Sequence, residues 1–155
     1  MNERLVSLLV PPELPPAAPG RALAVSVLAA ETTSPHGSPV GRLLLGTAVI
    51  DRSGRVRDGA LLTALGWGAG ERLTVGMAPG AAVLRRVADG AFRIDGRGQV
   101  FVPAAVRALL GIGSGERMVL VALLDADVLV MHPVAVVAGW LAGHYDDLPG
   151  TGDER

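Results

Sequence analysis

The chain has 155 residues, a net charge of -1 at neutral pH and no cysteine, and half of its residues are apolar. This length and composition predict one compact domain or two very small ones with an aliphatic core, and they argue against global disorder. The lack of cysteine excludes disulfides, thiolate zinc sites and cysteine nucleophiles, and the near-neutral charge gives no bulk attraction to nucleic acid.

Residues 1–42 read as a proline-rich, partly flexible N-terminal segment. Prolines concentrate in residues 1–20, and residues 31–41 are rich in Ser, Thr, Pro and Gly, a composition typical of linkers. Between them, the apolar stretch 22–30 predicts a strand or a short helix, because its periodicity fits both. The first residues lack a secretory-signal pattern, and no apolar run approaches the ~20 residues that span a bilayer. We therefore expect a soluble cytoplasmic protein with no membrane partner.

The central part of the chain repeats itself. Moving the stretch 51–75 forward by 44 positions, with one gap beside Leu110, aligns it with residues 95–120 and gives 11 identities in 25 positions. Self-similarity at one offset indicates one supersecondary unit that is used twice. Each repeat is near the lower size limit for burying a core, so the two are expected to fold together. The first unit covers residues 43–87 and the second covers residues 88–132.

Both units predict the same order of elements: strand, strand, short helix, strand, strand. We expect strands at 43–51, 55–57, 73–77 and 82–86 with a helix at 60–65 in the first unit, and strands at 91–95, 99–102, 118–123 and 128–131 with a helix at 104–110 in the second. Pro103 suits the first position of a helix, and Asp58 is a candidate N-cap. Gly66 and Gly111 suit the left-handed residue that ends a helix.

A C-terminal helix is predicted over residues 133–145, followed by an acidic flexible tail over residues 146–155. Apolar residues recur in this helix at helical spacing, at Val134, Val137, Trp140 and Leu141. A stripe of this kind usually covers a core. We therefore expect the helix to pack against the strands.

Two motifs in the repeated units resemble a known family. The turns Ile50–Val56 and Ile94–Val100 share the pattern Asp-x-x-Gly, and the segment Val102–Ile112 has a proline before a helix that ends in Leu-Gly-Ile. A Gly-Glu pair and a strand follow that helix. In this order, spacing and duplication the motifs resemble the AbrB/MazE/SpoVT swapped-hairpin family of small bacterial DNA-binding domains, over residues 45–132.

The resemblance implies a mainly β fold with short helices. In that family two units exchange hairpins and form one interlaced β-barrel, with DNA-contacting side chains on one side. This chain carries both units, so the resemblance implies that one polypeptide forms the pseudo-twofold barrel by itself. A homodimer with four units is the alternative.

The sequence departs from the family pattern at three places. The first unit has Asp58-Gly59 where the second has Val102-Pro103, and Gln99 replaces the arginine of the family's turn. The adjacent arginines that the family's helix often bears are reduced to Arg107 in the second unit, with Thr63 in the first. Fewer arginines predict weaker DNA binding with a flatter salt dependence.

Arginines around the two glycine turns are the candidate DNA-binding residues, because a guanidinium fork suits both phosphates and guanine edges. The first unit carries the positive excess, with net charge +3 over residues 44–87 against -1 over residues 88–131. The first set is Arg52, Arg55 and Arg57, of which the last two are expected on one face of a strand. The second set is Arg93, Arg97, Gln99 and Arg107, with Asp89 and Asp95 near enough in sequence to neutralise part of it. An ordinary solvated rim is the alternative for both sets.

No other residue pattern indicates chemistry. Asp51 and Asp95 lie in glycine turns, and we expect each carboxylate to accept backbone hydrogen bonds rather than to form a catalytic pair. The histidines, His36, His132 and His144, lack metal-ligand spacing. Glycines follow the two short helices rather than precede them, unlike those of a phosphate-binding loop. The sequence therefore predicts no enzyme, no metal and no cofactor.

Two functions from different classes remain. The first is a transcriptional regulator that binds double-stranded DNA through the arginine face. The second is an antitoxin or protein-interaction module with weak or lost DNA binding, in which a flexible terminus wraps a toxin-like protein. A small-molecule sensor is more distant, because Trp67 and Trp140 are better explained as packing residues than as pocket walls.

Overall fold

The structure is a computed structural model, and it describes residues 30–33 and 39–146. The predictions for residues 1–29 and for the tail from residue 147 onward lie outside the described residues.

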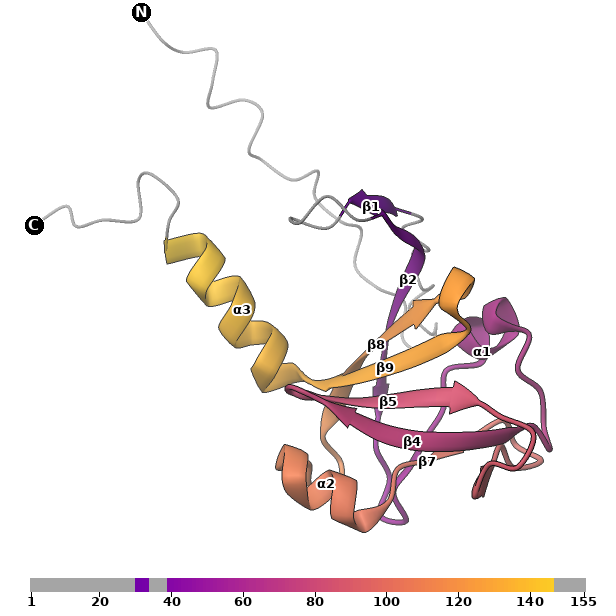
Figure 1. Cartoon of the computed structure of the whole chain (residues 1–155). Helices are drawn as coiled ribbons and strands as arrows, with labels where there is room; N and C mark the ends of the chain where they lie inside the picture. Colours follow the sequence, from indigo (N-terminus) through magenta and orange to yellow (C-terminus); the bar gives the residue numbers. More distant parts are fainter. Residues whose placement is uncertain (1–29, 34–38, 147–155) are drawn as a thin grey trace, which may run out of the picture.

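Over the described residues the fold is mainly β, as predicted, with three short α-helices (Figure 1). A seven-stranded antiparallel sheet has the order β1-β2-β8-β9-β5-β4-β6, and β3 and β7 form a second, two-stranded sheet. The strands are β1 (Ala30–Thr33), β2 (Pro39–Val49), β3 (Arg55–Val56), β4 (Arg72–Ala78), β5 (Ala81–Arg86), β6 (Phe92–Arg93), β7 (Val100–Phe101), β8 (Arg117–Leu123) and β9 (Val128–Pro133). A 3-10 turn, η2 (Leu124–Ala126), joins β8 to β9.

The large sheet interleaves strands of the two units, with the second unit's β8–β9 between the first unit's β2 and β5. The first strand of the first unit, β2, pairs with β8 of the second unit over seven residues, and the first strand of the second unit, β6, pairs with β4 of the first. The hairpins β4–β5 and β8–β9 lie side by side through the β5–β9 pair. Neither unit therefore completes a sheet from its own strands, and the two are not separate modules.

One buried aliphatic core serves both units. Val56 of β3 lies opposite Val100 of β7, and their exposed fractions are 1% and 2%. Ile50 and Ile94, the residues before the two turns, are equally inaccessible at 0% and 2%. Among the described residues, no polar or charged side chain is buried. Burial of apolar surface shared by both units is therefore the main source of stability.

The helices α1 (Gly59–Leu65) and α2 (Ala104–Leu110) end as the sequence predicts. Gly66 and Gly111 follow them with φ of 69° and 66°, in the left-handed region. Asp58 caps α1, because its Oδ1 accepts a hydrogen bond of 3.0 Å from Leu61 N. Pro103 precedes α2 instead of forming its first residue, since its ψ of 147° is extended.

The hydrogen bonds of these helices correct the alignment of the two units. Trp67 N donates to Leu62 O and Ile112 N to Arg107 O, each at 2.8 Å, so the helix ends correspond at an offset of 45 residues. In the strands before the helices, Val56 and Val100 correspond at an offset of 44 residues. The extra residue of the second unit therefore lies just before α2, not beside Leu110 as predicted. Arg107 takes the position that Leu62 holds in α1.

Residues 31–41 were predicted as an extended or mobile linker, and the described part of the stretch is extended, in β1 and at the start of β2. β1 pairs antiparallel with the start of β2, with Ala30 opposite Leu43 and Glu31 opposite Arg42. Thr32 and Thr33 are β-branched and favour extended backbone. Backbone pairing with a neighbouring strand outweighs the linker-like composition.

The C-terminal helix α3 (Val134–Asp146) projects away from the strands (Figure 1). Its predicted packing is wrong, because none of its residues is buried and the exposed fractions of Trp140 and Leu141 are 55% and 47%. Trp140 meets His132 of β9 edge-on, with ring centroids 5.0 Å apart. Within the described segments, no helix has the length and apolar character needed to cross a membrane.

Candidate nucleic-acid interface

The two glycine turns have the same backbone hydrogen bonds. In the first, Asp51 Oδ1 accepts from Ser53 N at 2.8 Å and from Arg55 N at 2.9 Å. In the second, Asp95 Oδ1 accepts from Arg97 N and from Gln99 N, both at 2.9 Å. The prediction that these carboxylates organise their turns is confirmed.

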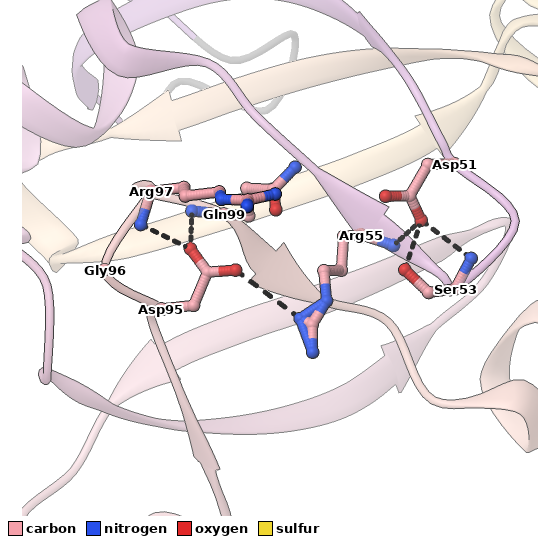
Figure 2. Close-up of a pocket in the computed structure, with 7 residues that line it drawn as sticks. All are labelled: Asp51, Ser53, Arg55, Asp95, Gly96, Arg97 and Gln99. Atoms are coloured by element: carbon pink, nitrogen blue, oxygen red, sulfur yellow. Dashed lines mark hydrogen bonds and ion pairs between the residues drawn. The ribbon is translucent and has the colours of Figure 1, made fainter.

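The pair β3–β7 brings the turns together around an open hollow of about 480 Å³ (Figure 2). Val56 and Val100 point into the core, so the residues beside them in each strand point the other way. The hollow combines predicted site residues with the turn carboxylates, and it is lined by Asp51, Ser53, Arg55, Asp95, Gly96, Arg97 and Gln99.

Arg55 crosses from one unit to the other. Its Nη1 lies 3.4 Å from Asp95 Oδ2, and the two side chains are 40% and 30% exposed (Figure 2). The sequence suggested that Asp95 neutralises part of the second arginine set; its carboxylate pairs with Arg55 of the first set and also feels the charge of Arg97. A partly exposed pair of this kind contributes little stability, so a phosphate can compete for the guanidinium.

Hydrogen bonds lower the pKa of both turn carboxyls below 3.8. For Asp51 the main cause is the backbone N–H of Arg55, followed by the Ser53 hydroxyl. For Asp95 the main cause is the backbone N–H of Gln99, and the nearby charge of Arg55 adds to it. Both groups are therefore anionic at neutral pH and offset part of the positive charge of the hollow.

Arg107 extends from α2 to the first turn. Its Nε donates to Val102 O at 3.2 Å. A Cβ added to Gly54, which has φ +82°, would come within 3.0 Å of that nitrogen and 2.9 Å of Val102 O. Only glycine therefore fits at this point of the turn. Arg107 belongs in space with the first arginine set, although sequence assigned it to the second.

The remaining predicted site residues are more exposed to solvent than Arg55 and Arg107. Arg52, Arg57 and Arg97 are exposed, and none forms an ion pair with a described residue. Arg93 is exposed on β6, opposite Arg72 of β4. The structure thus joins Arg55, Arg97 and Gln99 directly and Arg107 through Gly54, while Arg52, Arg57 and Arg93 flank the turns.

Sequence reasoning missed two features. Ser53 lines the hollow, and its Oγ donates to Asp51 Oδ1 at 2.7 Å; a serine two residues after an aspartate is a local signal for this bond. Elsewhere, Asp127, with φ +53°, accepts from Trp67 Nε1 at 2.7 Å and from Arg86 Nε at 3.1 Å. Nothing local predicts this second cluster, because its members are far apart in the chain.

In the described residues, no group of His, Asp or Glu has a metal-binding arrangement. Comparison with protein-family models, with curated proteins and with solved structures gives no match for this chain.

Proposed function

We propose that this protein is a DNA-binding transcriptional regulator of the AbrB/SpoVT type, which contacts duplex DNA through the surface of the two glycine turns. The observation that supports this most is the β3–β7 pair, because it joins two turns with the same backbone hydrogen bonds around Arg55, Arg97 and Gln99. Arg107 adds a further guanidinium beside Gly54.

The strand order supports the architecture that this function needs. We propose that the cross-unit pairs β2–β8 and β4–β6, with β3–β7 between the turns, form the interlaced swapped-hairpin barrel of that family within one chain. A rigid core under both turns holds the guanidinium groups at a fixed spacing.

The binding energy would come mainly from phosphates. Each guanidinium that replaces a condensed counterion contributes to affinity and to its salt dependence, while base edges supply the selectivity. The anionic Asp51 and Asp95 reduce the local field. Binding is therefore expected to be of moderate strength and to weaken with salt.

The test is a titration of labelled duplex by fluorescence anisotropy at several salt concentrations, with Arg52→Gln compared with the matched control Arg42→Gln. Arg42 is also exposed, although it pairs with Asp125 at 3.3 Å, and it lies at the other end of β2, about 30 Å from the turn if each residue adds about 3.3 Å. We expect Arg52→Gln to reduce the slope of log K against log salt by about 0.9, the value for one phosphate contact. The control should leave that slope unchanged.

Two results contradict the proposal. One is the absence of duplex binding even at low salt. The other is an equal loss from the two variants, which would mean that only net charge matters.

A protein-interaction module or antitoxin is the second candidate, and α3 is the observation that favours it. The helix exposes Trp140, Leu141 and Tyr145, and none of its residues is buried. Aromatic residues are enriched in protein interfaces. The test is co-purification from the source cells with the unchanged chain and with Trp140→Ser. A defined partner that is lost with Trp140→Ser, together with no duplex binding, would favour this function.

A further inference from the structure

The two turns share a backbone but carry different side chains. Besides the carboxylate bonds, Asp51 N donates to Arg55 O at 2.9 Å and Asp95 N to Gln99 O at 3.1 Å, so the turns superimpose in hydrogen-bond pattern. Three arginines of the first turn have no cationic equivalent in the second: Arg52 corresponds to Gly96, Arg55 to Gln99 and Arg57 to Phe101. The first half is therefore the more cationic one.

The helices increase this difference. Arg107 lies against Gly54 of the first turn, but its equivalent in α1 is Leu62, which is 4% exposed in the core. A Cβ added to Gly98 would meet no atom within 4 Å, so no side chain covers the second turn there. Arg52, Arg57 and Arg107 thus adjoin the first turn, Arg93 and Arg97 adjoin the second, and Arg55 reaches from the first turn to Asp95 of the second.

The ion pair between the turns has no equivalent formed by the corresponding residues of the other unit. Arg55 reaches Asp95 at 3.4 Å, whereas the equivalent pair would join Gln99 to Asp51, and a neutral amide forms no ion pair. The backbone of the two turns is therefore related by the pseudo-twofold symmetry, but their charged side chains are not.

We propose, resting on the proposed function, that this protein binds DNA in one fixed orientation and prefers a non-palindromic site, with phosphate contacts concentrated beside the first turn. A palindromic site presents the same chemical groups to both halves of the protein. Because the two halves of the protein differ, such a site can match only one of them. A bidentate arginine contact to guanine distinguishes bases strongly enough to set the orientation.

The first part of the experiment selects a binding site from a random duplex pool with the full chain. The second part maps orientation on that site with an iron chelate that cleaves nearby DNA. The chain contains no cysteine, so Thr63→Cys and Ala108→Cys each give one attachment point. Both positions are exposed, and they are equivalent in α1 and α2, because Gly66 N bonds to Thr63 O as Gly111 N bonds to Ala108 O.

We expect each labelled variant to cleave one end of the site, with opposite ends for the two variants and an excess of at least about tenfold over the other end. Native mass spectrometry counts the chains on each duplex, and cleavage is scored within the segment that one chain covers. Adding Gln99→Arg, which makes the second turn more like the first, should reduce that excess.

The possible failures separate the two proposals. Equal cleavage at both ends by each variant, or a palindromic site within one chain's segment, overturns the orientation and leaves DNA binding intact. No enrichment from the pool and no cleavage, even at low salt, overturns the proposed function and this inference with it.

Discussion

The first and second units have the same turn backbone but differ in the side chains that surround it. The Asp and Gly positions recur in both turns and produce matched hydrogen bonds, and the two halves contribute Ile50 and Ile94 to one core. The helices differ, because Leu61, Leu62 and Leu65 of α1 are buried while no residue of α2 is. The comparison teaches that a few residues in the repeat specify the fold, and that the other positions are available for unequal surfaces.

The largest expected effect tests whether the units share one core. Replacing either Ile50 or Ile94 by Ala should lower the free energy of unfolding by about 3 kcal/mol, because each removes buried methyl groups from the same cluster. Denaturant titration followed by circular dichroism should give one transition for both variants. If these variants fail to fold, Ile50→Val and Ile94→Val should each cost about 1 kcal/mol. Two separate transitions would contradict the shared core.

A smaller effect distinguishes the two helix ends. Trp67 follows α1 and donates its Nε1–H to Asp127, whereas the equivalent Ile112 makes no side-chain hydrogen bond. Trp67→Phe should therefore cost about 2 kcal/mol, from the lost bond and the smaller ring. Ile112→Val should cost about 1 kcal/mol. Thermal unfolding of the two variants measures the difference, and equal losses would show that the bond to Asp127 contributes little.

Acid should weaken both turns. The pKa values of Asp51 and Asp95 lie below 3.8 in the folded chain, so their contribution is present above the unfolded pKa and is lost as pH falls through the folded pKa. The melting temperature should therefore fall with pH below about 4. Asp51→Asn and Asp95→Asn keep the acceptor oxygen and should make this dependence flatter. An unchanged pH profile in both variants would contradict the role of these carboxylates.

The smallest effect is expected on α2. The side chain of Leu109 is 76% exposed, and Leu109→Gln should change stability by less than about 0.5 kcal/mol in a urea titration. A loss well above that value would mean that a second copy of the chain or another surface covers Leu109 in solution.

Local sequence patterns were sufficient for most of the fold. The helix bounds at 104–110, both glycine caps and the hairpin strands follow from short-range chemistry, namely apolar spacing, turn residues and left-handed glycines. The β1 strand was missed because its composition resembles a linker and only its pairing with β2 makes it a strand. The exposure of α3 was missed because an apolar stripe does not specify whether a partner surface lies within reach.

The candidate site was less predictable than the fold. The turn carboxylates were assigned correctly, since an Asp in a glycine turn bonds to its neighbours. The Arg55–Asp95 pair and the reach of Arg107 to Gly54 depend on which strands of different units lie together. A gap placed at the end of α2 instead of before its start was enough to give Arg107 the wrong equivalent. Long-range pairing therefore decides the charges of the site.

The most direct measurement is an NMR titration of the labelled full chain with a short duplex, in which each backbone amide reports its own surroundings. We expect the largest shifts at the turn amides, at Gly54, Arg55, Gly98 and Gln99, with larger changes in the first turn than in the second. Unchanged turns, or shifts confined to α3, would contradict it.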